Sequence, residues 1–536
     1  MKTVLSAFNA RFSHSSLAVR YIKAYNPDKD IYIAEFSIND SIHYAFSKLL
    51  GLKADIYCFS VYIWNIEITA KVAQMIKKAL PECTIIFGGP ECSYNPLEVL
   101  QKYDFLDYII LGEGEVTTGK VIESLEKGIK PSFDGVAHRE YIGKLSKCVD
   151  LNTINFPYDE NSFKELKNKI IYFETSRGCP FNCAYCLSSI EREIRYFPDK
   201  YVKSGFDAFF KNEVPLVKLI DRTFNANPSR ASKIIKYIID NSKNTKVHFE
   251  IDPSILTDEL IKLLSSAPKD MFQLEMGIQS ANIKTLKAVN RYANTDVIAK
   301  NIRKLKSAGN MHIHLDLIAG LPYEDYISFE KSFNFVFSLN PNMLQLGFLK
   351  VLHGTPIEKQ SGIVYADFPP YEVISTKWIS ADEICRLKLI DKAVDEINNS
   401  GAFKKTVRKI TSDNPFKAFE KIAEIFSSDR KLSRFDIYSS LYKIYGEYIF
   451  NELISDFIMF NKDRPMPDFA RIEYKPNFRK NCLKLLYDGK FKNKFKSTGN
   501  LNSIRFEPVK DKIYMMDYDN LILSDITEYY KKITEN

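Results

Sequence analysis

The sequence lacks any run of about 18 apolar residues, the length that a helix needs to span a bilayer. Its amino-terminal stretch, MKTVLSAFNARFSHS, has only a short apolar patch. It is without the long hydrophobic region and the small-residue cleavage site of a secretory signal. These absences predict a protein with no transmembrane helix and favour a cytoplasmic location without a membrane partner.

Signs of a disulfide framework and the common nucleotide-binding loops are also missing. The cysteines are odd in number, nine, with six scattered and three clustered, which favours a metal-binding or catalytic role for the cluster. No GxxxxGK[ST] motif occurs, and GEGEVTTG at 112–119 does not fit GxGxxG. What remains is a chain of 536 residues, 45% hydrophobic and 26% charged, which fits about three globular domains.

The first 150 residues alternate apolar, β-rich runs with helical stretches. The runs are KTVLSAF, DIYIAEFSI, ADIYCFSVYI, TIIFGG and DYIILG, with helices such as EITAKVAQMIKKAL between them. This alternation predicts an α/β domain over 1–150 with a doubly wound, flavodoxin-like (Rossmann-type) parallel sheet. The loops SVYIWN, GGPE and GEGE follow the third, fourth and fifth strands, so we expect them at one ligand-binding edge.

Residues 165–370 repeat the strand and helix alternation six times. The strand-like runs are NKIIYFETSRGC, LVKLID, KVHFEID, MFQLEMGIQS, MHIHLDLIAG and MLQLGFLKVL. They predict a central partial (β/α)6, TIM-like barrel, in which chemistry gathers at the carboxyl ends of the strands. The stretch ETSRGCPFNCAYC ends the first run and places Cys179, Cys183 and Cys186 at a CxxxCxxC spacing.

Three thiolates at this spacing can hold three of the four irons of a [4Fe–4S] cluster and leave one iron open. S-adenosylmethionine (SAM) can chelate that iron through its amino and carboxylate groups. An electron from the cluster can then break its sulfonium carbon–sulfur bond to give methionine and a 5′-deoxyadenosyl radical. A structural zinc site needs four ligands, and the loop has no histidine. Three incidental thiols are the remaining alternative.

The CxxxCxxC motif with an aromatic residue before its last cysteine resembles the signature of the radical SAM superfamily. The resemblance continues through IDRTFN, FEIDP, LEMGIQS, DLIAGLP and HGTP. It implies that four residues contact SAM: Tyr185, Glu250, Gly277 and Gln279. Tyr185 would pack near the adenine, Glu250 and Gln279 would make polar contacts, and Gly277 would let the backbone approach. Arg222 and Arg291 would meet carboxylates, although a satisfied buried polar group is the alternative for each residue.

The pattern FSVYIWN, FGGP and LGEGE resembles the cobalamin-binding domain found at the amino terminus of many radical SAM enzymes. This resemblance implies a corrin site lined by Val61, Tyr62, Trp64, Asn65, Gly88, Gly89, Pro90, Gly112 and Glu113. The DxHxxG signature of other cobalamin proteins is absent, so we expect no protein histidine as the lower cobalt ligand. His14, in RFSHSS, could still lie at the ligand edge, with surface capping as the alternative.

Residues 371–536 begin after Pro369 and Pro370 and are predicted to form a mainly helical substrate or accessory domain. This region resembles an uncharacterised carboxyl-terminal extension of one bacterial group of cobalamin-type radical SAM proteins. Its window 471–512 has twelve Lys/Arg against four Asp/Glu, a net charge of +8 that equals the excess of the whole chain. Interleaved aromatic residues would suit RNA or another anionic ligand; a strand pair with outward lysines is the alternative.

Together these features predict a cobalamin-dependent radical SAM enzyme, most simply a methyltransferase acting on an unactivated carbon. Its cofactors would be a [4Fe–4S] cluster, SAM and cobalamin, and its electron donor a flavodoxin- or ferredoxin-type protein. A cyclisation or rearrangement without methyl transfer is one alternative, and a nucleic-acid-binding module with a structural cluster is another. His353 follows the last strand and is a candidate for proton transfer, but the sequence offers it no partner. The substrate stays open.

Overall fold

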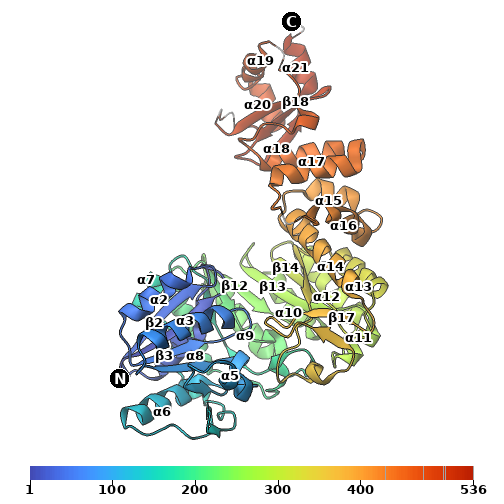
Figure 1. Cartoon of the computed structure of the whole chain (residues 1–536). Helices are drawn as coiled ribbons and strands as arrows, with labels where there is room; N and C mark the ends of the chain where they lie inside the picture. Colours follow the sequence, from blue (N-terminus) through green and yellow to red (C-terminus); the bar gives the residue numbers. More distant parts are fainter. Residues whose placement is uncertain (429, 475, 499, 501, 535–536) are drawn as a thin grey trace. The chain divides into compact units, whose positions relative to one another are not determined.

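The computed structural model describes residues 1–428, 430–474, 476–498, 500 and 502–534. The chain divides into two compact units (Figure 1). Unit 1 comprises Met1–Ser332, Leu339–Asn342 and Leu346–Ala381, and unit 2 comprises Phe333–Ser338, Met343–Gln345 and Asp382–Asn536. Among the residues described, none of the helices combines the length and hydrophobicity that a bilayer crossing requires.

A seven-stranded sheet forms the amino-terminal part of unit 1, in the order β2-β1-β3-β4-β5-β6-β7. Its strands are β1 (Thr3–Asn9), β2 (Ile31–Ser37), β3 (Ile56–Ser60), β4 (Thr84–Gly88), β5 (Tyr108–Ile110), β6 (Val136–His138) and β7 (Tyr141–Ile142). The first five are parallel, which confirms the doubly wound fold. Strands β6 and β7 add an antiparallel hairpin that the sequence pattern did not reveal, because it has only three and two residues.

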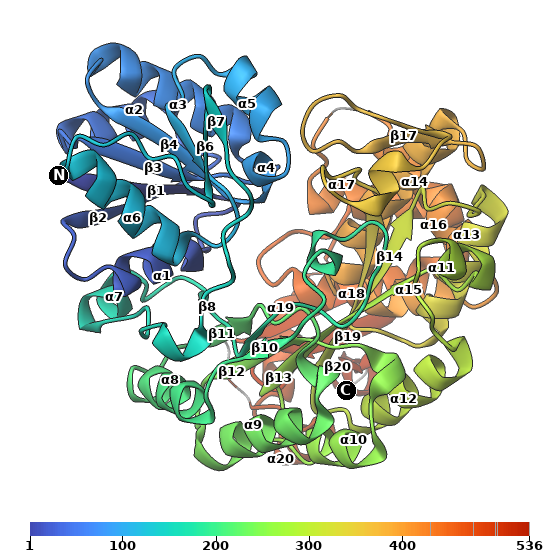
Figure 2. The same cartoon turned by 90° about the horizontal axis from the view of Figure 1, so that it is seen from below.

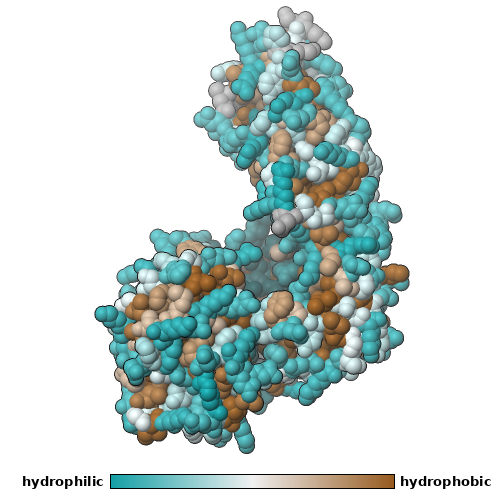
Figure 3. Space-filling view, in the orientation of Figure 1, coloured by the Kyte–Doolittle hydropathy of each residue, from teal (hydrophilic) through white to brown (hydrophobic). Residues whose placement is uncertain are grey.

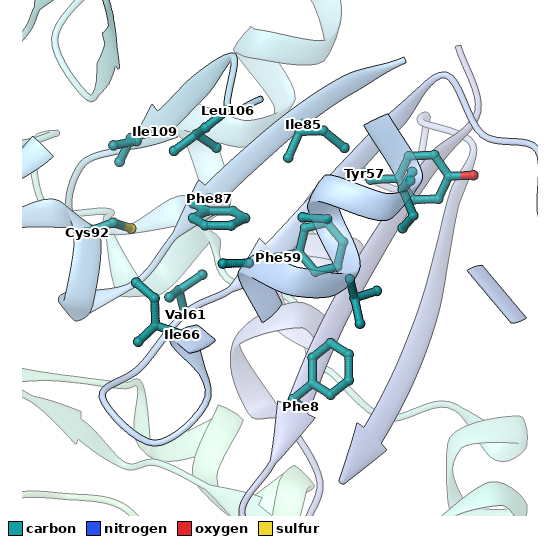
Figure 4. Packing of buried hydrophobic residues seen from close by; sticks show 14 of the residues in the cluster. Phe8, Tyr57, Phe59, Val61, Ile66, Ile85, Phe87, Cys92, Leu106 and Ile109 are labelled. Atoms are coloured by element: carbon teal, nitrogen blue, oxygen red, sulfur yellow. The ribbon is translucent and has the colours of Figure 1, made fainter. Parts of the chain in front are cut away.

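Both faces of this first sheet are apolar, which explains why its strands read as nearly continuous hydrophobic runs. Phe8, Phe59 and Phe87 belong to the core on one face, shown in Figure 4. Alternate residues of the same strands, such as Leu5 and Ile86, belong to the core on the other face. The covering helices are α1 (Leu17–Tyr25), α2 (Ile42–Gly51), α3 (Ile66–Ala79), α4 (Pro90–Ser93), α5 (Pro96–Lys102) and α6 (Gly114–Glu126).

A second sheet of six strands has the order β15-β14-β13-β12-β11-β8. Its strands are β8 (Ile171–Phe173), β11 (Leu216–Leu219), β12 (Lys246–Glu250), β13 (Phe272–Gln279), β14 (His312–Ala319) and β15 (Met343–Phe348). The pairs from β8 to β14 are parallel, as a partial barrel requires. Figure 2 shows helices on its outer side: α8 (Asp199–Lys211), α9 (Pro228–Asn241), α10 (Asp258–Ser265) and α12 (Thr295–Ala308).

Strands β13 and β14 alternate strictly between a buried apolar face and a partly accessible polar face. In β13 the buried positions are Phe272, Leu274, Met276 and Ile278, and the positions between them are Gln273, Glu275, Gly277 and Gln279. In β14 the partly accessible positions include His312, His314 and Asp316. Barrel interiors are usually filled by bulky apolar side chains, so a polar interior indicates space for ligands.

Shorter elements complete unit 1. They are the helices α7 (Glu160–Glu165), α11 (Ile283–Ala288) and α13 (Tyr326–Ser338), the latter ending in unit 2, and the strands β9 (Ser176–Arg177), β10 (Arg195–Tyr196), β16 (Ile363–Tyr365) and β17 (Val373–Thr376). Strands β9 and β10 pair antiparallel on either side of the cysteine loop and so close its ends.

Unit 2 is mainly helical, as predicted. Its helices are α14 (Ala381–Ala393), α15 (Lys404–Ile410), α16 (Pro415–Ala423), α17 (Arg434–Tyr445), α18 (Phe450–Phe460), α19 (Phe478–Leu485), α20 (Gly489–Phe495) and α21 (Thr527–Thr534). An antiparallel sheet of β18 (Ile504–Val509), β19 (Lys512–Asp517) and β20 (Ile522–Asp525) accompanies them. Hydrophilic residues predominate on the face of the chain seen in Figure 3.

Candidate active site

A cavity of about 710 Å³ opens at the carboxyl edge of the first sheet, within unit 1. The loops after β1, β3, β4 and β5 form one wall. Six residues from the second sheet and its loops also line it: Tyr172, Glu174, Arg177, Glu191, Ile220 and Arg222. The ligand edges of two parallel sheets therefore border one space, where the fold class places its ligands.

Seven of the nine residues predicted for a corrin site line this cavity: Tyr62, Trp64, Gly88, Gly89, Pro90, Gly112 and Glu113. The rings of Tyr62 and Trp64 stack with their centroids 4.3 Å apart and form a flat aromatic surface. Trp64 is 48% exposed, so an apolar face is left for a ligand to cover.

Val61 and Asn65 do not line the cavity. Val61 is fully buried in the core of the first sheet. Asn65 is also buried; its side-chain oxygen accepts from the Tyr62 amide at 2.8 Å, and its nitrogen donates to the Phe8 and Ser60 carbonyls at 3.0 Å. These bonds fix the loop that carries Tyr62 and Trp64, so the role of Asn65 in the structure is to hold the loop.

The cavity glycines are required for two different reasons. Gly89 has φ +122°, and a Cβ there would lie 2.4 Å from the Val61 carbonyl oxygen, so the backbone itself requires glycine. At Gly88 a Cβ would meet only Ile110, at an ordinary 3.5 Å. Gly88 therefore leaves open a space that a larger side chain would fill, which fits a bulky ligand lying against the strand end.

An ion-pair network forms the cavity wall around Arg177. Its guanidinium contacts Glu113 at 3.1 Å, Glu115 at 2.6 Å and Glu174 at 2.7 Å. Glu113 also meets Arg195 at 2.5 Å. Burial alone would raise the pKa of Glu113, but the two arginines outweigh burial and lower it. Glu113 is thus an ionised member of a network that joins the first sheet to the start of the second.

His14 lies on the cavity wall rather than at the free surface. Its Nδ1 is 2.9 Å from the hydroxyl of Tyr172 on β8. Burial, and then the charges of Arg11 and Lys218, lower the pKa of His14, so the imidazole is neutral at pH 7. Of the two roles considered from the sequence, this position favours the ligand edge over surface capping.

The cysteine loop is held by backbone contacts at both ends. Gly178 has φ +89°, and a Cβ there would lie 2.1 Å from the Glu193 carbonyl oxygen. The Cys179 amide donates to the Glu191 carbonyl at 3.1 Å, and the Ala184 amide donates to the Val289 carbonyl at 3.0 Å. Cys179 and Cys183 are buried and Cys186 is half-buried, a setting that shields an iron–sulfur cluster from solvent.

Arg291 links the cysteine loop to the predicted SAM contacts. Its guanidinium lies 3.8 Å from the Cys183 sulfur, 3.3 Å from the Asp252 carboxylate and 2.6 Å from the Gly277 carbonyl oxygen. Tyr185 lies near the same guanidinium. Burial strongly raises the pKa of Tyr185, and the charge of Arg291 opposes that rise. The structure therefore brings Cys183, Tyr185 and Gly277 together around one cation.

Gln279 and Glu250 occupy the ends of neighbouring strands. Gln279 has φ +70° at a register shift in β13, and its buried side-chain oxygen has no hydrogen-bond partner among the described residues. Such a strained residue with an unsatisfied polar atom points to a ligand contact. Burial raises the pKa of Glu250 to about 7, against the opposing charge of Arg222. Glu250, Gln279, Gly277 and Tyr185 lie outside the lining of the first cavity, whereas Arg222 lies on it.

Several functional candidates escaped sequence reasoning. Tyr172, Glu174 and Arg177 line the cavity. Glu174 and Arg177 belong to the ETSRGC stretch that contains the first cysteine, and this position was the signal that could have identified them. His353 has a partner that the sequence did not reveal: its Nδ1 lies 2.9 Å from a Glu358 carboxylate oxygen. The two residues are five positions apart in a loop. Because a loop has no regular geometry, this spacing does not predict a contact between them.

Three families match successive parts of the chain. A B12 binding domain matches residues 5–122, and the radical SAM superfamily matches residues 173–336. A protein family of unknown function, DUF4080, matches residues 359–517. The first two matches fall on the two sheets whose edges border the cavity.

Curated proteins and solved structures resemble large parts of this chain. The cobalamin-dependent radical SAM methyltransferase TokK of Streptomyces tokunonensis is 24% identical over 52% of this chain and 44% of its own length. An anaerobic magnesium-protoporphyrin IX monomethyl ester cyclase of Rubrivivax gelatinosus is 21% identical over 70% of each chain. The structure of OxsB with aqua-cobalamin and SAM bound has a TM-score of 0.63 at 15% identity, covering 93% of this chain and 84% of OxsB. This chain spans about half the length of the first curated relatives it matches.

Proposed function

We propose that this chain, which belongs to the radical SAM superfamily and carries a B12 binding domain, methylates an unactivated carbon of its substrate. Its family implies a [4Fe–4S] cluster, SAM and cobalamin as cofactors. The observation that carries the proposal is the cavity bordered by both sheets, because one reaction that uses two cofactors needs them to face a common space. The name of TokK supports methyl transfer as the reaction.

Different residues of the chain would hold the cluster and the corrin. Cys179, Cys183 and Cys186 would hold the cluster, and the face of Tyr62 and Trp64, with the space at Gly88, would hold the corrin. When bound, the cluster and SAM supply a radical that abstracts hydrogen, and cobalamin supplies a methyl group.

Other residues would orient these groups. Arg291 fixes the Gly277 carbonyl and stands beside Cys183, which positions the strand end against the cysteine loop. The unpaired Gln279 oxygen offers an acceptor to a hydroxyl or ammonium group of SAM. The Arg177 network closes the wall between the two sheets and limits access of water.

A cyclisation without methyl transfer is the second candidate function. The cyclase of Rubrivivax gelatinosus supports it, because the similarity extends over 70% of this chain, more than for TokK. The two reactions differ in how SAM is consumed. Methyl transfer uses one SAM as methyl donor and one as radical source, whereas a cyclisation needs only the second.

The test is anaerobic incubation of the reconstituted, cobalamin-loaded chain with a reductant, methyl-labelled SAM and extracts of cells. We expect S-adenosylhomocysteine and 5′-deoxyadenosine in about equal amounts, with label in a new product, because each turnover uses both SAM molecules. Protein reconstituted without cobalamin is the control and should make no labelled product. 5′-Deoxyadenosine with no S-adenosylhomocysteine would favour the cyclisation, and absence of both would refute the proposal.

The partners in the proposal are a reductant and an anionic ligand. A radical SAM enzyme needs an electron source, and we propose a flavodoxin- or ferredoxin-type protein in the cytoplasm, where cysteines outside disulfides are stable. The basic window 471–512 supports an anionic ligand such as RNA, although Lys475, Gly499 and Leu501 lie outside the described residues. Phe478 and Phe491 are buried, so contacts from lysines to phosphates are better supported than base stacking.

A further inference from the structure

A group of potential metal ligands lies on the partly accessible face of the second sheet, away from the cysteines in sequence. Glu275 lies on β13, and His314 and Asp316 lie on β14. Glu275 pairs in register with His314, and Asp316 follows two residues later, so all three side chains are on one face. One ligand atom from each lies within 4.8 Å of the others.

His314 and Asp316 lie close together on β14 and form an ion pair. The His314 Nε2 atom lies 2.9 Å from the Asp316 Oδ1 atom. Both atoms are buried, yet neither has a hydrogen-bond partner of acceptable geometry in the described structure. A buried nitrogen and oxygen this close would normally share a proton in line. Two ligand atoms at this separation can instead bind one ion that lies between them.

Neighbouring strands orient the third ligand. His248 Nε2 lies 3.0 Å from Glu275 Oε2, and Lys218 Nζ lies 3.3 Å from the same oxygen. These two contacts hold the Glu275 carboxylate in one position on the polar face of the sheet. Metal ligands are usually held in this way by a second layer of polar groups.

Lys218 is the strongest argument for a plain ion-pair network instead of a metal site. It supplies one positive charge against the two carboxylates of Glu275 and Asp316. The Lys218 ammonium contacts Glu275, and no contact between Lys218 and Asp316 is present among the described residues. The His314 nitrogen and Asp316 oxygen that lack hydrogen-bond partners there are therefore not explained by Lys218.

We propose that Glu275, His314 and Asp316 bind a divalent transition-metal ion, which we assign as zinc. One imidazole nitrogen and two carboxylate oxygens are ligands that zinc accepts, and three protein ligands leave its fourth position open. Glu275 pairs in register with Glu250, so the open position lies in the part of the sheet next to the predicted SAM contact. There the ion would hold an oxyanion of a substrate. This inference goes beyond the proposed reaction and does not depend on it.

The test uses the full chain with its cluster reconstituted, so that iron occupies the three cysteines. After equilibration with micromolar zinc and removal of the excess, we expect about one zinc per chain by elemental analysis. X-ray absorption at the zinc edge should show nitrogen and oxygen neighbours at about 2.0 Å and no sulfur at about 2.3 Å. A sulfur shell would place the zinc on cysteines and overturn the assignment, as would zinc-free protein.

Substitutions locate the site. His314→Gln and Asp316→Asn nearly preserve the shape of the side chain, but each removes a zinc ligand. Each should weaken zinc binding by about 100-fold or more, because changing a residue that only hydrogen-bonds to a metal ligand already costs about 10- to 100-fold. His312→Gln, on the same strand and face but outside the ligand group, should bind zinc like the wild type. Melting temperature and iron content confirm that each variant is folded. Equal zinc binding by all four proteins would overturn the proposal. Wild-type protein that binds zinc but forms no 5′-deoxyadenosine would count against the proposed function alone.

Discussion

Replacing Cys183 by alanine should remove the iron–sulfur cluster and lower reductive cleavage of SAM by about 1000-fold or more, equivalent to about 4 kcal/mol of lost transition-state stabilisation. Cys183 is buried in the loop after β9, and Arg291 lies 3.8 Å from its sulfur. With two thiolates the cluster has too few protein ligands to persist. Iron content, the electron paramagnetic resonance signal of the reduced protein and 5′-deoxyadenosine formation measure the effect.

Cys385→Ala is the matched control for this prediction. Cys385 is exposed on α14 and lies in unit 2. Its loss should leave iron content and SAM cleavage unchanged, because it is far along the chain from the CxxxCxxC motif. A Cys183→Ala protein that keeps four irons and full SAM cleavage would show that the loop is not the cluster site.

Replacing Gly88 by leucine should weaken cobalamin binding by about 10- to 100-fold, the effect of the 1–3 kcal/mol that an inserted side chain typically costs in a packed site. A Cβ at Gly88 meets only Ile110 at 3.5 Å, and the residue has no positive φ, so the strand itself tolerates a side chain. The added atoms would instead occupy the cavity. Titration with hydroxocobalamin, followed by visible absorption after gel filtration, measures the loss.

Two further variants separate blocked space from general destabilisation. Gly88→Ala adds a single methyl group and should retain most cobalamin binding. Gly51→Leu adds the same side chain at the exposed end of α2, where no atom lies within 4 Å of a Cβ. It should bind cobalamin like the wild type. Normal binding by Gly88→Leu, with an unchanged melting temperature, would place the corrin elsewhere.

The sequence was most informative where one physical pattern acts alone. The doubly wound parallel sheet of β1 to β5 followed from apolar runs buried on both faces, and the cysteine loop followed from its spacing. Reasoning by loop position was less reliable for single side chains. Val61 and Asn65 stand in the same loop as Tyr62 and Trp64 but face the core and the backbone, because successive residues of one loop can point in opposite directions.

Other features depend on contacts between distant segments and leave no local signal. The pairing of His14 with Tyr172 joins residues 158 positions apart, and the Arg177 network joins both halves of unit 1. The left-handed backbone of Gln279 arises at a register shift between β13 and β14, which no residue preference of glutamine would indicate. The Glu275, His314 and Asp316 group likewise appears only when the strand register is known.

The measurement that tests the account most directly is Mössbauer spectroscopy of the chain reconstituted with ⁵⁷Fe, recorded with and without SAM. Cys179, Cys183 and Cys186 should hold three irons of a [4Fe–4S] cluster, so SAM should change the isomer shift of one iron in four. A spectrum that SAM leaves unchanged, or a cluster whose fourth iron already carries a protein ligand, would contradict the central claim that this loop keeps one iron open for SAM.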